Sequence, residues 1–139
     1  MIVFDTNVLS ALMMPERNAA IVEWADGQPA ESIWTTAVCV LEIRTGILFL
    51  PDGRRKERLG AGFSRLLREQ LSGRILPFDA DAAERAAGIA ASRTLRGSNV
   101  GTWDIQIAGI VIVRNATLAT RNTKDFGDLD IRLVNPWNV

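Results

Sequence analysis

Short apolar segments alternate with longer helical segments along the chain, and this alternation restricts the fold more than any other feature of the sequence. Apolar, β-prone runs predict strands at residues 2–4, 32–35, 74–78, 118–120 and 131–134. Pro77 indicates that the third strand ends there or lies at an edge of the sheet. Because strands that alternate with helices form parallel sheets covered on both faces, we expect an α/β protein with three α/β/α layers and a central, mainly parallel sheet.

Apolar residues recur at helical spacing between the predicted strands. The spacing predicts helices directly after Asp5 and over residues 16–26, 37–50, 53–72, 81–96 and 105–113. Asp81 and Glu84 have the spacing of a capping box, and a loop at residues 97–99 leads to Thr102 as the expected N-cap of the last helix. The β-branched residues of that last segment also suit a strand, but its two small residues favour a closely packed helix.

Size, charge and hydropathy narrow the functional classes. The 139 residues, 47% of them hydrophobic, have the composition of one globular domain, so we expect a single domain over residues 1–139. Sixteen basic residues balance sixteen acidic ones, so a nucleic-acid partner would need a local positive patch. The start of the chain lacks the pattern of a signal peptide, and the longest apolar stretch, residues 107–113, is too short to cross a bilayer. We therefore expect a cytoplasmic protein with no membrane contact.

Histidine is absent from the sequence, and its absence restricts the chemistry. A Ser-His-Asp or Cys-His relay, an imidazole-bound zinc ion and a histidine general base are all excluded. An enzyme of this composition would need carboxylates, together with a cation that prefers oxygen ligands. Cys39 is the single cysteine and lies in an apolar run, which excludes an intrachain disulfide and favours a buried thiol in a reducing cytosol over a reactive thiol.

Polar side chains follow or interrupt the apolar segments at four places. Asp5 follows the first predicted strand, Glu42 interrupts an apolar helix, and Asp104 opens another helix. Asn122 and Asp125 follow the fourth predicted strand. Because ligands of parallel α/β sheets bind beyond the carboxyl ends of the strands, these side chains are the first candidates for a functional site.

Each of these acids also has a purely structural explanation. Asp5 would cap the next helix, and Glu42 would turn to solvent or pair with Arg44. Asp104 would interact with its helix dipole, worth about 0.3–1 kcal/mol, and Asp125 would be an ordinary turn residue. If the acids converge instead, two carboxylates about 4 Å apart repel by about 4 kcal/mol at an effective dielectric near 20. Magnesium, or manganese as the alternative ion, would relieve this repulsion and assist phosphodiester hydrolysis.

Four segments of the sequence also carry a resemblance to a known family. They are residues 2–10 (IVFDTNVLS), 40–46 (VLEIRTG), 103–108 (WDIQIA) and 118–126 (LATRNTKDF). In this order they resemble the motifs of the PIN-domain ribonucleases, specifically the VapC and FitB toxins of bacterial toxin–antitoxin pairs. Residues 74–79 (RILPFD) and 135–137 (NPW) are also similar to FitB-type sequences. One short motif would be weak evidence, whereas four in the same order are strong evidence.

The resemblance implies a PIN-like fold and a magnesium site. It assigns Asp5, Glu42 and Asp104 as the metal ligands, with Thr6 and Thr120 supporting them through hydrogen bonds. Three acids carry a charge of −3 against +4 for two magnesium ions, so we expect one tightly held ion in the free protein. The implied reaction is hydrolysis of an RNA phosphodiester by water activated at that site.

The fourth acidic position and the RNA contacts are less specific. Asn122 stands where some relatives have aspartate, and Asp125 is the alternative at this position, directly or through water. Trp103 could stack on an unpaired base or pack in the protein, and Arg44 and Arg121 could contact phosphate or orient the acids. Residues 51–75 carry seven basic and three acidic side chains, which suits either a phosphate backbone or a solvated helix face.

The resemblance also implies partners. It predicts a homodimer and a VapB-type antitoxin that covers the acidic pocket, with any DNA contact made through the antitoxin. The function predicted is therefore that of a magnesium-dependent endoribonuclease toxin. The alternative is a catalytically weak PIN-fold protein that acts through its antitoxin or RNA partner, and Asn122 is its best support. A receiver-like phosphoacceptor is more distant, because paired acids do not follow the first strand.

Overall fold

A five-stranded parallel sheet forms the centre of the protein, in a computed structural model that describes residues 1–98 and 101–139. The strand order is β3-β2-β1-β4-β5. The strands are β1 (Ile2–Phe4), β2 (Ile33–Thr36), β3 (Ile75–Leu76), β4 (Thr117–Ala119) and β5 (Arg132–Val134). All five predicted strands are present, within two residues of their expected bounds, and β3 with its following proline is an edge strand as expected.

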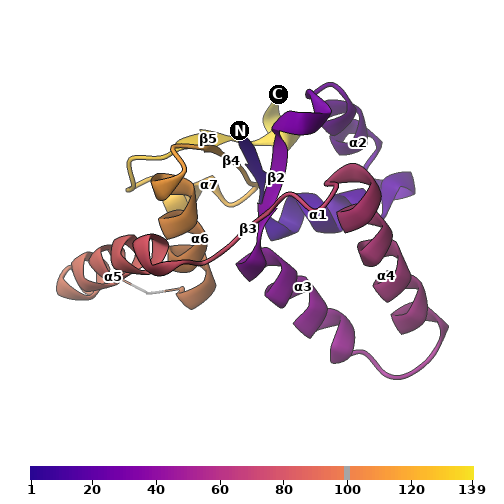
Figure 1. Ribbon diagram of the computed structural model, residues 1–139, viewed down its shortest axis with the longest axis horizontal. Helices are drawn as coiled ribbons and strands as arrows, with labels where there is room; N and C mark the ends of the chain where they lie inside the picture. The colour runs from indigo at the N-terminus through magenta and orange to yellow at the C-terminus, as the bar shows by residue number, and fades with distance from the viewer. Residues whose placement is uncertain (99–100) are drawn as a thin grey trace.

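Helices cover both faces of this sheet, which confirms the predicted three-layer α/β/α architecture. The helices are α1 (Thr6–Leu12), α2 (Ala19–Asp26), α3 (Ala37–Leu48), α4 (Arg54–Arg65), α5 (Ala80–Leu95), α6 (Thr102–Val113) and α7 (Thr123–Phe126). Figure 1 shows α5, α6 and α7 on one side of the sheet and α1 to α4 on the other. In the described residues, no helix combines the length and the apolar character that crossing a membrane requires.

The central position of β1 brings the ends of three strands together. Val3 pairs with Trp34 of β2 on one side and with Leu118 of β4 on the other. The register continues past the strands, because the Asp5 N–H donates to the Ala119 carbonyl at 3.0 Å. Since parallel strands end at the same edge of a sheet, the residues that follow β1, β2 and β4 gather at one rim.

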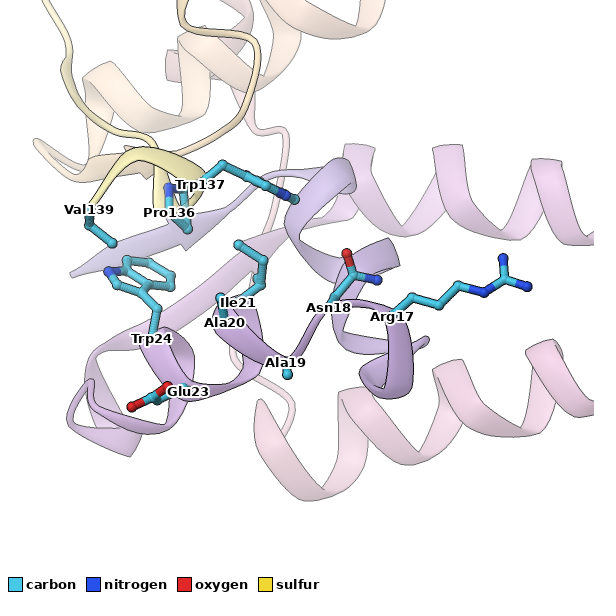
Figure 2. Close-up of a pocket in the computed structure, with 10 residues that line it drawn as sticks. All are labelled: Arg17, Asn18, Ala19, Ala20, Ile21, Glu23, Trp24, Pro136, Trp137 and Val139. Carbon is cyan, nitrogen blue, oxygen red and sulfur yellow. The ribbon is translucent and has the colours of Figure 1, made fainter.

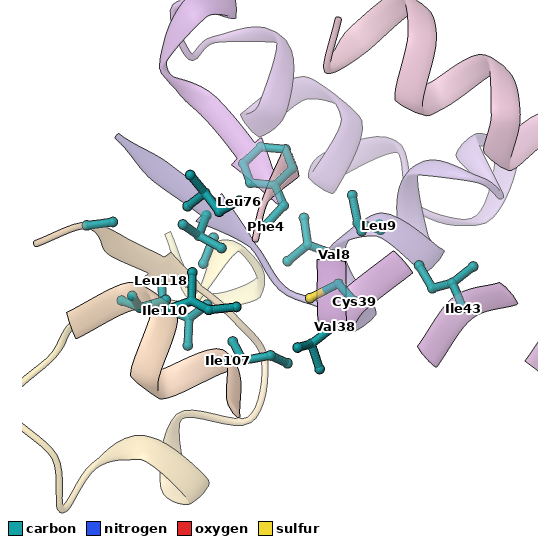
Figure 3. Packing of buried hydrophobic residues seen from close by; sticks show 14 of the residues in the cluster. Phe4, Val8, Leu9, Val38, Cys39, Ile43, Leu76, Ile107, Ile110 and Leu118 are labelled. Carbon is teal, nitrogen blue, oxygen red and sulfur yellow. The ribbon is translucent and has the colours of Figure 1, made fainter. Parts of the chain in front are cut away.

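The hydrophobic core lies between the sheet and both helix layers. Figure 3 shows Phe4, Val8 and Leu118 packed with side chains of α3 and α6. Helix α6 is apolar around most of its circumference and is fully buried from Ile107 to Val111, which explains why its sequence shows no clear amphipathic pattern. Cys39 is completely buried, as expected. The pKa of its thiol is raised to about 11, mainly by this burial and to a smaller extent by the negative charge of Asp5.

Some local predictions were wrong or incomplete. Asp79, not Asp81, caps α5, because its carboxylate accepts a hydrogen bond from the Ala82 N–H at 3.0 Å. Gly101, not Thr102, is the N-cap residue of α6, and Thr102 is its first helical residue. Asn99, the last residue of the predicted loop, lies outside the described residues.

Three helical segments also differ from their predicted extent. The helix predicted over residues 16–26 is a 3₁₀ turn (Pro15–Arg17) followed by α2, and the helix predicted over residues 53–72 is α4 followed by a π-helical turn (Leu66–Gln70). The short helix α7 had no predicted counterpart. Two further 3₁₀ turns, Ala30–Ser32 and Pro136–Asn138, lie before β2 and after β5.

Candidate active site

Asp5 lies at the end of the central strand and is only 3% exposed. Asp5 is the N-cap residue of α1, so it does cap the helix that follows it, as one of the two explanations from the sequence proposed. Its carboxylate accepts hydrogen bonds from the Thr6 N–H at 2.8 Å, the Thr120 hydroxyl at 2.7 Å and the Asn7 side-chain amide at 3.4 Å. Burial raises the pKa of Asp5, and these hydrogen bonds partly oppose the rise. The side chain is therefore fixed in one orientation at the rim of the sheet.

Glu42 reaches the same rim from α3. The Thr6 hydroxyl donates to its Oε1 at 3.0 Å, so one residue after Asp5 orients a second acid. Burial raises the pKa of Glu42, and the charges of Asp5 and Asp104 raise it further. Glu42 is thus neither paired with Arg44 nor an isolated surface residue.

Asp104 completes the group from the first turn of α6. Burial raises its pKa, and so do the charges of Asp5 and Asp125, while the charge of Arg93 lowers it. Asp104 and Glu42 line one open pocket of about 540 Å³, together with Trp103, which is 38% exposed. Three acids that are distant in the sequence therefore act on one another electrostatically at one rim, as the sequence predicted.

The segment after β4 supports the site through its backbone and hydroxyl groups. Thr120 is fully buried, donates to Asp5 and accepts a hydrogen bond from the Asn122 N–H at 3.0 Å. The Arg121 N–H donates to Asn7 Oδ1 at 3.0 Å, which ties this segment to α1. Asn122 and Asp125 are both exposed, and the charge of Asp125 acts on Asp104. This charge makes Asp125 the stronger candidate for the fourth acid.

Arg93 of α5 is an important residue that the sequence analysis missed. It is 6% exposed and donates to Asp128 Oδ1 at 3.1 Å and to the Asp125 carbonyl. Asp128 also accepts from Arg96 at 2.7 Å, and these arginines lower the pKa of its carboxyl. Arg93 thereby fixes the backbone of Asp125, the candidate for the fourth acidic position. Helical spacing could have placed it on the buried face of α5, with Ala82, Ala86 and Ile89.

The candidate RNA contacts separate into two groups. The Arg44 guanidinium points to α4 and not to the acids. It donates to the Gly60 carbonyl at 3.2 Å and to Ser64 Oγ at 2.8 Å, and both of these residues belong to α4. Its role is to join α3 to α4. Trp103 lies in the acidic pocket, and the Arg121 guanidinium lies 5.0 Å from the centre of the Trp137 ring. Trp103 thus lies beside the acids, whereas the Arg121 side chain lies against Trp137 and does not line the acidic pocket.

The donor set at the rim suits a hard divalent ion. Neighbouring carboxylates raise the pKa values of Glu42 and Asp104. This group of acids therefore lacks a compensating positive charge, which a cation would supply. In the described residues, no three acidic or cysteine side chains are close enough to enclose one ion. Magnesium does not need such a cage, because it commonly uses one or two carboxylates and completes its shell with water and phosphate oxygens. The rim therefore suits a magnesium ion that one or two of the carboxylates of Asp5, Glu42 and Asp104 would hold, with the other coordination positions open.

Mild acidification is expected to stabilise the metal-free protein. The pKa values of Asp5, Glu42 and Asp104 are raised in the fold, so between the ordinary and the raised value the folded state binds more protons than the unfolded chain. The free energy of unfolding therefore increases as the pH falls through that interval. The pKa of Asp128 is lowered in the fold, so its stabilising contribution to the free energy of unfolding is lost only below pH 3.8, the ordinary pKa of the group.

Urea unfolding in EDTA between about pH 7 and the ordinary glutamate value of 4.5 measures this effect. The midpoint is expected to increase toward the lower pH, and the Glu42→Gln variant should show a smaller increase. A midpoint that decreases over this interval contradicts the predicted electrostatic repulsion.

Comparison with known proteins agrees with this geometry. The family profile of the PIN domain matches residues 2–131, which contain all three converging acids. The chain belongs to the PIN-domain family. The resemblance of its four motifs to this family is therefore confirmed.

Individual relatives of this PIN-domain protein span nearly its whole length. It is 34% identical to VapC ribonuclease Y4jK of Sinorhizobium fredii, covering 99% of this chain and 98% of the relative. It is 33% identical to toxin FitB of Neisseria gonorrhoeae, covering 99% of both. A solved structure of FitAB bound to an IR36 DNA fragment superposes with a TM-score of 0.88 at 33% identity, covering 100% of this chain and 97% of that one.

Proposed function

We propose that this PIN-domain protein is a magnesium-dependent endoribonuclease and the toxin of a VapBC-type toxin–antitoxin pair. The observation that supports this most directly is the mutual electrostatic effect of Asp5, Glu42 and Asp104 at the carboxyl edge of the sheet. Such a group is suited to holding a divalent ion against a phosphodiester, and the relatives named VapC ribonuclease and FitB toxin support the same function.

The side chains of the site have distinct roles in this proposal. Asp5, Glu42 and Asp104 would hold the ion, with Mn²⁺ as the alternative to Mg²⁺. When bound, the ion supplies positive charge beside the phosphodiester and acidifies water. The Thr120 and Thr6 hydroxyls donate to Asp5 and Glu42, respectively, and so hold the two carboxylates in place. No histidine takes part, because the sequence contains none.

The charge balance favours one ion in the free protein. The three acids carry −3 together, and Asn122 adds no charge at the position where an aspartate would. Asp125, whose backbone carbonyl accepts a hydrogen bond from Arg93, would help a second ion to bind when RNA phosphate is present. Isothermal titration with magnesium in the absence of RNA is expected to find one strong site, and two strong sites would contradict this assignment.

A groove beside the acids supports the proposal of a VapB-type antitoxin. It has a volume of about 290 Å³, and Thr6, Glu42, Ile43, Ile47 and Leu59 are among its lining residues. An apolar antitoxin segment that carries one basic side chain would fill the groove and neutralise the acids. DNA contact would then belong to the antitoxin, and the similar FitAB complex has been solved bound to a DNA fragment.

The outer face of α3 supports the homodimer. Leu41 and Leu48 lie seven residues apart on one face of α3 and are 52% and 67% exposed. An apolar face of this kind suits a second copy of the chain. Sedimentation of the isolated chain checks this, and a monomer at micromolar concentration would contradict it.

Cleavage of structured RNAs by the purified, antitoxin-free protein tests the main proposal. We expect cleavage with magnesium or manganese, loss of cleavage in excess EDTA and recovery when magnesium is restored, because the ion supplies the charge that the reaction needs. Undiminished cleavage in EDTA would contradict the metal site. Metal-independent RNA or antitoxin binding without any cleavage would favour the alternative, a catalytically weak binding protein.

A further inference from the structure

A second pocket lies apart from the acids, between the start of α2 and the C-terminal turn Pro136–Asn138. Its volume is about 470 Å³. Figure 2 shows the rings of Trp24 and Trp137 at its walls, with Ile21 between them. Arg17 lies at one end of the pocket and Glu23 at the other. The pocket therefore combines the accessible parts of two half-buried indole rings with a cation.

Arg121 connects this pocket to the candidate active site. Trp137 follows β5, which ends beside β4, and the Arg121 guanidinium lies 5.0 Å from the centre of the Trp137 ring. The backbone N–H of Arg121 donates to Asn7 Oδ1, and the Asn7 amide in turn donates to Asp5. A single residue thus contacts both the aromatic wall of the pocket and the segment that orients the first acid.

We propose that this pocket binds an unpaired nucleotide of single-stranded RNA, at a distance from the phosphodiester that is cleaved. The proposal rests on the ribonuclease function proposed above. Indole rings offer a surface on which any base can stack, and arginine guanidinium groups suit phosphate oxygens. Because the chain has no net charge, RNA binding needs local cations of this kind, and Arg17 in the lining and Arg121 against the Trp137 ring supply them.

The side chains of the lining favour RNA over an aliphatic peptide segment in this pocket. An amphipathic peptide fits better in the groove between α1, α3 and α4, where several aliphatic side chains form the lining. The lining of the pocket of Trp24 and Trp137 has fewer large aliphatic side chains than that groove, and it contains the cation Arg17. Glu23 is the acid among its lining residues and lies at the end opposite Arg17.

Two substitutions test the pocket while leaving the acids unchanged. Arg17→Glu reverses the charge at one end, and Ala20→Phe places a bulky side chain at a lining position of α2. Arg85→Glu is the matched control, because Arg85 is exposed on α5, on the other side of the sheet. Thermal unfolding of the three variants identifies any general loss of stability.

Binding is measured in EDTA by fluorescence anisotropy of labelled, unstructured RNA, so that it is independent of cleavage. We expect Arg17→Glu and Ala20→Phe to bind an oligonucleotide of about 12 nucleotides about 5–100-fold more weakly than Arg85→Glu does. Affinity for an oligonucleotide of about 4 nucleotides, which reaches only one of the two sites, should change less. In magnesium, the same variants should increase KM for the longer RNA and leave kcat unchanged.

The outcomes separate this proposal from the ribonuclease function. If both pocket variants bind the longer RNA as the control does, or if the wild-type protein binds no RNA, the pocket proposal is wrong. If they instead lose affinity only for an antitoxin peptide, the pocket serves a protein partner and the proposal is also wrong. If the wild-type protein binds RNA through the pocket but never cleaves it, the pocket proposal stands and the ribonuclease proposal fails.

Discussion

The Asp104→Asn variant is expected to cleave RNA at least about 100-fold more slowly than the wild-type protein, since even a residue that only supports a metal ligand typically contributes 10–100-fold. The same variant should unfold at a higher temperature than the wild-type protein in EDTA. Asp104 is half-buried next to Asp5 and Asp125, and removing its charge relieves their repulsion. Loss of activity combined with a gain in stability distinguishes a metal ligand from a residue that merely holds the fold together.

Magnesium provides the complementary measurement. Adding the ion should raise the unfolding temperature of the wild-type protein and have much less effect on Asp104→Asn, because an ion stabilises only the state that binds it. Asp130→Asn is the matched control, since Asp130 is exposed and precedes β5, at the edge of the sheet away from the acids. A variant at position 104 that is less stable than the wild-type protein in EDTA, or that cleaves RNA normally, would contradict the proposed role.

The sequence allowed all five strands and the positions of the three acids to be predicted, because both follow from local rules. A short apolar run that ends in a polar residue defines a strand and places that residue at the carboxyl edge, as at Phe4 and Asp5. Glu42 was recognisable because it interrupts an apolar helix that has no exposed acidic face. The resemblance to the PIN-domain family then assigned these acids to a single site.

The remaining features depend on contacts between distant segments. The caps of α5 and α6 were misplaced by one or two residues, because sequences such as Asp79 to Asp81 offer two equivalent capping side chains. Arg93 was missed because its partners lie in the segment around α7, more than thirty residues away. Arg44 was considered for the site because it is close to Glu42 in the sequence, although residues two apart on a helix point to different sides.

The Gly109→Ala variant is expected to lose stability by about 1–3 kcal/mol or more, the range typical of overpacking in a closely packed core. Helices α5 and α6 cross at Gly109, where an added Cβ would lie 2.4 Å from the Ala82 carbonyl oxygen and 3.2 Å from the Ala86 Cβ. A backbone oxygen cannot turn aside as a long side chain does, so the two helices must separate. Chemical unfolding measures the loss, and RNA cleavage should also fall because α6 carries Asp104 in its first turn.

Gly88→Ala is the matched control for this prediction. Gly88 is also an interior helical glycine, but nothing lies within 4 Å of the position its Cβ would take. Alanine should therefore stabilise α5 by about 0.4–1 kcal/mol through the smaller conformational freedom of the unfolded chain. The same substitution at two helix positions is thus expected to change the free energy of unfolding in opposite directions. A Gly109→Ala variant as stable as the wild-type protein would show that α5 and α6 do not pack closely enough to fix Asp104.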